Sequence, residues 1–590
     1  MRIGIAQINT VPGEFDRTVG HMVAQSQRAA EQGVELLIFP LAALAGIDVL
    51  PFADRGSYLR DVSDALARLS DELACPALVP APIDTGGEMS VFDVVLIEGG
   101  AVRPLRATRN VAGASEREVT QFEFGGLRLA LALSHDDLDT LDDYDYEVDA
   151  VIFLSGYSFA LDDPSSAMGA DLDFSRFVPD AQTMGAWLVG AASVGGYGDQ
   201  VFSGSSMVLA PSGELAALAP AFEESLLVAD VVVPAPERLG DAVVPEVYDA
   251  PFHLWQAICL GIHDYLSKQG MTDVALCLDG SLDSMVLAAL ASDAVGPLHV
   301  HALVGGSSGN RAPACRELGR RLRIDVTSSV GQVRGFDQRD LDELELAALA
   351  REHDALAISS LDKTALALGA HAGNVRAAAL CPLGDVYRSD VLDMAHVRNT
   401  ISPLFRRVDL TAADAIELPM SAGSSRLLTT EADFTSVDEV LMGYVEYDRP
   451  LGELVATESY DPELVDAVLR AERRTEPLRR AMPPVLAMST HTLDDARFPL
   501  GVSWHDEHLD FVGESPAEAH GSEPEHPEDE APVERRPAHD IDATLAMLRD
   551  LAEQGGFVPS DLMEQAASFK PGEQGEGADP LGWMSPFSEN

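Results

Sequence analysis

The chain has 590 residues, of which 46% are hydrophobic and 6% aromatic. This length exceeds what one hydrophobic core serves, so we expect two or three globular units with tails. The 96 acidic and 40 basic residues give a formal net charge of −56. Such a charge repels the phosphates of nucleic acids and of anionic membrane surfaces. The composition therefore argues against nucleic acid and membrane as partners.

Cysteine usage and the N-terminus indicate the compartment. The five cysteines are far apart and lie mostly among apolar residues, which predicts reduced core thiols rather than disulfides or a metal cluster. The first residues enter a strand pattern directly, without the apolar region of a signal peptide. No apolar run reaches the roughly 18 residues that a membrane span needs. These features predict a cytoplasmic protein.

Residues 1–233 predict an α/β domain. Short apolar segments alternate with helical stretches and glycine-rich turns over this region. We expect strands at Arg2–Ile8, Glu35–Phe39, Leu127–Leu133, Ala150–Leu154 and Ser206–Leu209. The following segment, 234–251, holds four prolines and little periodicity, which predicts a linker between domains.

A second domain is predicted over 252–509. A helix at 252–269 precedes the apolar strand Val274–Leu278, and the helix Ser284–Val295 is followed by the strand Leu298–Val304. Strand, helix and strand within about 30 residues indicate a βαβ unit with parallel strands. Because ligands bind at the carboxyl ends of such strands, 274–304 is the candidate ligand corner.

The last 81 residues differ from the rest in composition. Residues 510–590 are rich in Glu, Pro, His, Gly and Ser, and such a segment buries too little apolar surface to fold. We expect an acidic disordered tail with one short amphipathic helix at 540–554.

Several segments together carry a family resemblance. Residues 1–9 and Val34–Pro40 resemble the start of a nitrilase-type amidase domain. The second half resembles the synthetase half of the glutamine-dependent NAD⁺ synthetases, and the two halves follow the family's order and spacing. The segments that carry this second likeness are Cys277–Ser284, Ile358–Gly369, Pro382–Met394 and Asp461–Leu469.

The resemblance implies a fold and a reaction. The expected fold is an N-terminal nitrilase-like αββα sandwich, followed by a doubly wound parallel α/β domain of the adenine nucleotide α-hydrolase type. In the family, the amidase half frees ammonia from glutamine. The synthetase half uses ATP and Mg²⁺ to adenylylate nicotinic acid adenine dinucleotide and then aminates it. The family resemblance also implies a homo-oligomer.

The residues that would hydrolyse glutamine are absent. This chemistry uses a thiolate nucleophile, a carboxylate base and a lysine that supports the oxyanion. Leu41 follows Phe39-Pro40 where the family has the carboxylate, and Ser134 stands where it has the cysteine. No lysine precedes Lys268. The sequence therefore predicts an amidase domain without glutaminase activity.

The segment Ser134-His135-Asp136 contains the residue types of a hydrolase triad. We expect these residues at the end of a strand, where consecutive side chains point to opposite faces and cannot form a relay. The favoured interpretation is a polar strand end without catalytic function.

The pyrophosphate loop of the synthetase half is altered. The family's loop reads Ser-Gly-Gly-x-Asp-Ser, and Gly280, Asp283 and Ser284 keep three of these positions. Asp279 replaces a neutral hydroxyl by an anion. A carboxylate about 4 Å from one phosphate charge costs on the order of 4 kcal/mol at an effective dielectric near 20, unless Mg²⁺ bridges the two. Ser281 adds a Cβ at a position where we expect a positive φ that favours glycine.

Two further elements complete the candidate ATP and phosphate site. Leu361–Ala365 replaces the family's Gly-Asn-Lys-Ser-Glu element but retains Lys363, and Arg388 stands where the family has a phosphate-binding lysine. Asn374-Val375 stands in place of a Gly-Asp pair. Asp362, Lys363 and Arg388 are equally consistent with surface charges.

These substitutions favour one hypothesis over two alternatives. The leading hypothesis is an inactive family member kept as a binding, regulatory or scaffold subunit, which forms a homo-oligomer or assembles with an active paralogue. The first alternative is an ammonia-dependent NAD⁺ synthetase, or an ATP pyrophosphatase with a changed substrate, acting through Asp283, Ser284, Lys363 and Arg388. The second is an interaction protein that docks through the acidic residues 510–540 and the helix at 540–554.

Overall fold

The computed structural model describes residues 1–495 and Asp506, apart from short gaps, of which the longest are 84–90, 107–118, 163–175 and 371–376. All of the described residues belong to one compact unit, Met1–Ser515. The predicted tail and the helix predicted at 540–554 lie outside the described residues. Among the described helices, none is both long and apolar enough to cross a membrane.

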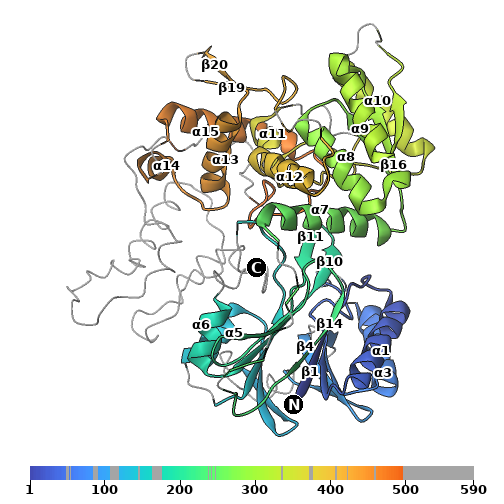
Figure 1. The fold of residues 1–590 in the computed structure, drawn as a ribbon, viewed down its shortest axis with the longest axis vertical. Coiled ribbons are helices and arrows are strands. Elements are labelled where there is room, and N and C mark those ends of the chain that lie inside the picture. The colour runs from blue at the N-terminus through green and yellow to red at the C-terminus, as the bar shows by residue number, and fades with distance from the viewer. Residues whose placement is uncertain are drawn as a thin grey trace, which may run out of the picture. The chain divides into compact units, whose positions relative to one another are not determined.

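Two six-stranded sheets build the N-terminal half (Figure 1). The first has the order β14-β1-β2-β3-β4-β5 and the second the order β13-β12-β9-β8-β7-β6. The strands of the first sheet are β1 (Arg2–Gln7), β2 (Leu36–Ile38), β3 (Ala77–Ile83), β4 (Val91–Glu98), β5 (Ala101–Pro104) and β14 (Ser225–Asp230). Those of the second are β6 (Thr120–Phe124), β7 (Leu127–Ala132), β8 (Ala150–Ser155), β9 (Trp187–Ala192), β12 (Met207–Leu209) and β13 (Leu215–Leu218).

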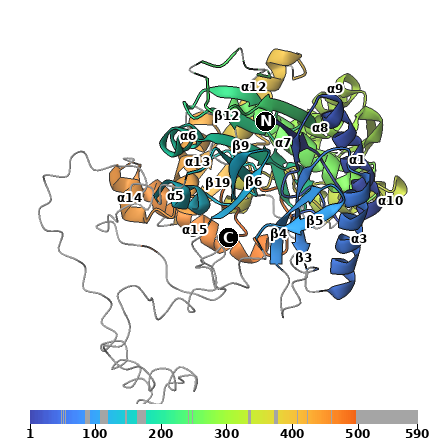
Figure 2. The ribbon, with the colours of Figure 1, turned by 90° about the horizontal axis from the view of Figure 1, so that it is seen from below.

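Alternating side chains on these strands fill three apolar layers. Ile3 and Ile5 of β1 pack with Leu129 and Leu131 of β7 between the two sheets. The opposite face of the first sheet packs against α1 (Phe15–Glu31) and α3 (Gly56–Glu72). The outer face of the second packs against α5 (His135–Asp143) and α6 (Phe177–Met184). Figure 2 shows α3 and α5 on opposite sides of this sandwich. The predicted αββα sandwich is confirmed.

A four-stranded parallel sheet builds the second half, in the order β17-β16-β15-β18. Its strands are β15 (Val274–Leu278), β16 (Val300–Val304), β17 (Asp325–Ser328) and β18 (Leu356–Ala357). Val274 and Leu276 face the core that includes α7 (Ala250–Ser267), α8 (Leu282–Val295) and α9 (Ala312–Leu322). Ala275 faces α10 (Gln338–Glu352) on the other side. Helices therefore cover both faces, which confirms the predicted doubly wound domain.

The remaining elements pack as a largely helical layer beside this sheet (Figure 1). They are α11 (Lys363–Leu368), α12 (Arg388–Ile401), the hairpin β19 (Ile416–Pro419) and β20 (Ser425–Leu428), α13 (Glu431–Val445), α14 (Leu451–Thr457) and α15 (Pro462–Arg479). The apolar face of α12 joins the core of the parallel sheet, and the apolar residues of the other elements form one buried cluster around Phe434, Val437 and Val465.

The βαβ unit was predicted closely. The strand β15 has the predicted bounds, whereas α8 begins at Leu282 instead of Ser284. The next strand begins at Val300 rather than Leu298, because Pro297–His299 form a 3₁₀ turn after Gly296, whose φ is 87°. Proline favours the first position of such a turn, and glycine tolerates the positive φ before it.

Helix α7 joins the two halves. Its residue Asp264 is 2% exposed and accepts hydrogen bonds from the side-chain amide of Asn9 (2.6 Å) and from the N–H of Gly196 (2.8 Å). Lys268, which directly follows α7, donates to the carbonyl of Gly196 (2.7 Å). Gly196 lies on β10 (Val194–Tyr197), which pairs with β11 (Gln200–Ser203). A buried polar joint thus connects α7 to the sandwich.

Candidate functional site

The two altered amidase positions lie at one edge of the sandwich. Ser134 follows β7, and Gly156 follows the parallel neighbour β8. Leu41 packs against this edge, because a Cβ built on Gly156 would lie 3.0 Å from the Cδ2 atom of Leu41. The structure therefore brings both predicted positions to the carboxyl ends of the central strands.

Ser134 serves as a helix cap in this arrangement. Its Oγ accepts a hydrogen bond from the N–H of Asp137 (3.2 Å), and the Asp137 carboxylate accepts from the N–H of Leu133 (2.7 Å) and of Ser134 (3.2 Å). Such reciprocal bonds satisfy amides that a helix start leaves unpaired. The role of Ser134 in the described geometry is structural.

The prediction that Ser134-His135-Asp136 end a strand was wrong. The strand β7 ends at Ala132, and α5 begins at His135. The His135 ring stacks on Tyr157, with ring centroids 4.8 Å apart, and lies 5.6 Å from the ring of Phe153. The chain leaves the strand before Ser134 because Ser134 caps α5. The imidazole of His135 lies in an aromatic stack.

The altered pyrophosphate loop occupies the ligand corner of the second half. It connects the carboxyl end of β15 to α8, and the strand order reverses between β15 and β18. This reversal is where doubly wound sheets bind ligands. Gly280 has a φ of 86°, and a Cβ there would lie 2.8 Å from Cβ of Arg311. Glycine is therefore needed at position 280, both because of the positive φ and because Arg311 leaves no room for a Cβ.

The expectation of a positive φ at Ser281 was wrong. Ser281 has a φ of −74° and is the N-cap of α8, where its side chain accepts from the N–H of Ser284. Serine is a favoured residue at this position. The substitution at 281 therefore adds a helix cap and no backbone strain.

The chain's own carboxylates occupy the amide donors at the start of α8. Oδ1 of Asp279 accepts hydrogen bonds from the N–H (2.9 Å) and the Oγ (2.6 Å) of Ser281. Oδ1 of Asp414, from a loop 132 residues away in sequence, accepts from the N–H of Leu282 (2.6 Å). The N–H of Ser284 donates to Asp283 (2.7 Å). Helix N-termini of this kind attract anions, and here aspartate side chains accept from these amides.

Arg388 lies beside this loop in a buried ion-pair cluster. Its Nε donates to Asp362 (2.7 Å), one of its terminal nitrogens donates to the carbonyl of Asp414 (2.6 Å), and the other lies 3.8 Å from Asp283. Burial raises the pKa of Asp283 to about 8, although the charge of Arg388 opposes this rise. The guanidinium charge of Arg388 is therefore compensated mainly by Asp362.

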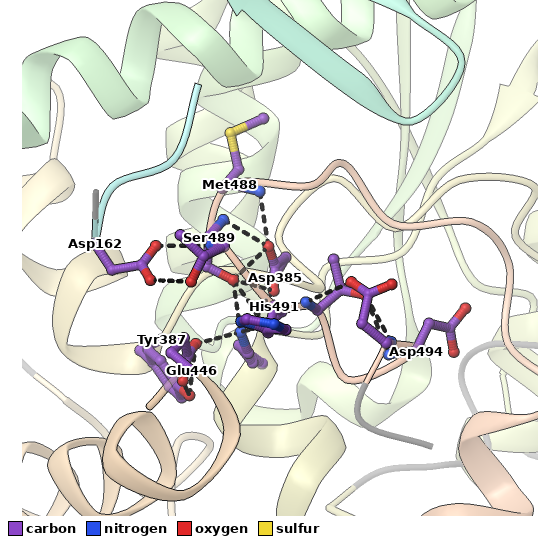
Figure 3. A network of polar contacts seen from close by, with 12 residues as sticks. Asp162, Asp385, Tyr387, Glu446, Met488, Ser489, His491 and Asp494 are labelled. Atoms are coloured by element: carbon purple, nitrogen blue, oxygen red, sulfur yellow. Dashed lines mark hydrogen bonds and ion pairs between the residues drawn. The ribbon is translucent and has the colours of Figure 1, made fainter. Parts of the chain in front are cut away.

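Lys363 is held in a second buried cluster, and Figure 3 shows its partners Asp385, Glu446, Ser489 and His491. Its Nζ atom lies 2.5 Å from Glu446, 2.7 Å from Asp385, 2.9 Å from the Oγ of Ser489 and 2.8 Å from the carbonyl of His491. The side chain of Lys363 is fully buried. Burial raises the pKa of Glu446 to about 7, while the charge of Lys363 opposes it. The ammonium has its hydrogen-bonding capacity filled by this cluster.

The interpretation of Asp362, Lys363 and Arg388 as surface charges was wrong, because each is at most 3% exposed. Sequence reasoning missed Asp414, Asp385 and Glu446 as their partners. Asp385 lies within the Pro382–Met394 segment, which could have indicated it. The other two come from loops and helices far along the chain, and nothing local marks them. Asn374-Val375 lies outside the described residues.

Comparisons with known proteins agree with this architecture. Residues 254–317 match the family model described as NAD synthase. The chain is 26% identical over 554 residues to the glutamine-dependent NAD(+) synthetase of Rhodobacter capsulatus, covering 86% of this chain and 99% of that protein. It is 22% identical to the enzyme of the same name from Acinetobacter baylyi, covering 85% and 98%.

The chain is a homologue of the glutamine-dependent NAD(+) synthetases.

Solved structures share the fold of this synthetase homologue. The glutamine-dependent NAD+ synthetase of Acinetobacter baumannii, in complex with adenosine diphosphate, has a TM-score of 0.59 at 20% identity, covering 84% of this chain and 97% of that one. The glutamine-dependent NAD(+) synthetase of Cytophaga hutchinsonii has a TM-score of 0.63 at 15% identity, covering 85% and 98%. The homologue therefore combines the family's fold with the altered residues described above.

Proposed function

We propose that this synthetase homologue carries out neither half of the family reaction and acts as a binding, regulatory or scaffold subunit in the cytoplasm. The observation that carries the proposal is the placement of Asp279 and Asp414 on the amides that begin α8. A phosphate group in this loop needs those same donors.

Electrostatics oppose phosphate binding at this loop. A phosphate would have to displace Asp279 and Asp414 from the N–H groups of Ser281 and Leu282. Each ionised carboxylate left about 4 Å from a phosphate charge costs on the order of 4 kcal/mol at an effective dielectric near 20. Two such costs together disfavour a phosphate in this loop.

Magnesium does not relieve this repulsion readily, so the residues present do not fit ATP with Mg²⁺. Mg²⁺ prefers ionised carboxylates and retains several waters. Burial raises the pKa of Asp283, which disfavours the ionised form that Mg²⁺ binds. Lys363 and Arg388, the two cations predicted for the candidate site, are engaged with buried carboxylates.

The amidase half supports the same conclusion independently. Leu41 cannot accept a proton, and Ser134 caps α5 through the N–H of Asp137. A serine hydroxyl needs an adjacent base to become a nucleophile. We therefore expect no release of ammonia from glutamine.

The test is a coupled assay on the full chain. Pure protein is supplied with ATP, Mg²⁺, nicotinic acid adenine dinucleotide and either glutamine or ammonia, with the Rhodobacter capsulatus synthetase as the positive control. We expect neither NAD⁺ nor glutamate above the no-enzyme background. NAD⁺ formation with ammonia alone would support the ammonia-dependent alternative and overturn the proposal, as would turnover of glutamine.

An inactive subunit acts through assembly, and a homo-oligomer or an assembly with an active paralogue is part of this proposal. Light scattering on the full chain, alone and mixed with an active synthetase from the same cell, tests it. We expect a species larger than one chain, and a strictly monomeric protein in both samples would contradict a scaffold role. A variant truncated after Leu509 shows whether the acidic tail is required.

A further inference from the structure

Two histidines and an aspartate converge at the amino ends of strands in the four-stranded parallel sheet, opposite the pyrophosphate loop. His301 is the second residue of β16, Asp325 is the first residue of β17, and His353 directly follows α10. One potential ligand atom from each lies within 4.8 Å of the others. Figure 1 shows β16 and α10 side by side in this part of the domain.

The fold explains why these three side chains meet. His301 pairs with Asp325 in the parallel register of β16 and β17, so both point to one face of the sheet. Leu303, two residues after His301, packs on that face against α10. His353 directly follows α10, and its ring reaches the same face. It stacks on the ring of His301, with centroids 3.7 Å apart.

One ring nitrogen of His301 has no hydrogen-bond partner. The side chain is 10% exposed, and its Nε2 atom lies 2.9 Å from Oδ1 of Asp273. Its Nδ1 atom makes no hydrogen bond among the described residues and lies 3.6 Å from Oδ2 of Asp325. Buried polar atoms without partners are rare and call for an explanation.

The contact with Asp273 fixes the role of one nitrogen of His301. A carboxylate accepts hydrogen bonds, so Nε2 of His301 donates to Asp273. In the neutral ring Nδ1 then presents its lone pair to Asp325, and a cation between the two groups would use both.

We propose that His301, Asp325 and His353 bind a divalent transition-metal ion of the Zn²⁺ class. Imidazole and carboxylate are the ligands that Zn²⁺ takes in proteins, and three of them leave a fourth position for water. Asp273 is a positioning residue, because a carboxylate that accepts from the distal N–H of a histidine orients that ligand. Because the His353 ring stacks on His301 in the structure, metal binding requires this ring to turn its lone pair toward the ion.

The test measures Zn²⁺ uptake by the metal-free, untagged full chain in calorimetry and equilibrium dialysis. We expect one equivalent at this site. His353→Gln and Asp325→Asn, at positions outside the core, each lower the affinity of the protein for Zn²⁺ at least tenfold. The matched control is His299→Gln, because His299 also bonds to Asp273 (3.1 Å) but lies outside the group of three. The Zn²⁺ affinity of His299→Gln should stay within twofold of that of the wild type.

A spectroscopic arm separates this site from adventitious binding by surface histidines. Co²⁺ in place of Zn²⁺ gives the wild type and His299→Gln a visible absorption band that His353→Gln lacks, and excess Mg²⁺ does not displace it. Circular dichroism verifies that the variants are folded. The proposal is overturned if the wild type takes up no Zn²⁺ at 100-fold molar excess, or if His299→Gln loses as much affinity as His353→Gln.

Discussion

Lys363 and its partners show how a phosphate-binding residue type becomes a structural one. Its ammonium contacts the carboxylates of Asp385 and Glu446, and all three side chains are fully buried. Such a cluster is stabilising only while it is complete, because each charge left without a partner keeps its desolvation cost.

Replacing Lys363 by Met therefore destabilises the fold. Lys363→Met leaves Asp385 and Glu446 without their cation, and we expect a loss of about 3 kcal/mol or more in the free energy of unfolding, measured by urea denaturation. Arg320→Met is the control, because the Arg320 side chain is 74% exposed; its effect should stay within about 0.5 kcal/mol. Equal unfolding free energies for Lys363→Met and Arg320→Met would contradict a stabilising role of the buried Lys363 cluster.

The arginine beside the loop gives a second prediction at this scale. Asp362 binds Arg388 at 2.7 Å and also caps α11 through the N–H of Ala365 (2.7 Å). Asp362→Ala removes a buried partner and a helix cap together, so we expect a loss of about 3 kcal/mol or more in unfolding free energy. Asp461→Ala, which removes an exposed cap of α15, should cost about 1 kcal/mol. A smaller loss of unfolding free energy for Asp362→Ala than for Asp461→Ala would contradict the buried pairing of Asp362 with Arg388.

At the scale of elements, α7 determines how the two halves are joined. Asp264→Ala removes the acceptor for Asn9 and Gly196 and leaves Lys268 half-buried beside the gap. We expect about 3 kcal/mol of destabilisation, seen as a lower urea midpoint by intrinsic fluorescence. His263 contacts the same carboxylate (2.9 Å) from a 54% exposed position, so His263→Ala should cost at most about 1 kcal/mol. A larger destabilisation by His263→Ala than by Asp264→Ala would contradict the role of Asp264 in joining the two halves.

Elements with a strong apolar pattern could be predicted from the sequence, and turns set by polar contacts could not. The run Val274–Leu278 gave β15 its bounds because every residue in it packs on one face or the other. Ser134 and Ser281 were placed wrongly because each caps a helix, and the capping bonds depend on backbone geometry. Asp414 could not be predicted as a ligand of the α8 amides, since a bond across 132 residues leaves no local signal.

At the scale of the whole molecule, buried carboxylates make stability depend on pH. Burial raises the pKa of Asp283 to about 8, of Asp438 to about 7 and of Glu446 to about 7. Between about pH 5 and pH 8 the folded protein keeps protons that the unfolded chain has released. Stability therefore falls as pH rises through this window. The lowered pKa of Asp273 acts only below about pH 4 and does not reverse the trend.

We expect the free energy of unfolding to drop by several kcal/mol between pH 5.5 and pH 8.5, at about 1.4 kcal/mol per unit of pKa shift. Urea denaturation at both values, in 0.5 M NaCl, separates this effect from the repulsion of the net charge of −56, which salt screens. A protein more stable at pH 8.5 than at pH 5.5 would exclude protonated buried carboxylates.

Calorimetric titration of the full chain with ATP and Mg²⁺ tests most directly whether the aspartates at the start of α8 exclude phosphates. The Rhodobacter capsulatus synthetase serves as the comparison under the same conditions. The predicted result is no saturable heat with this chain up to millimolar nucleotide. Saturable binding with a micromolar Kd would contradict the account.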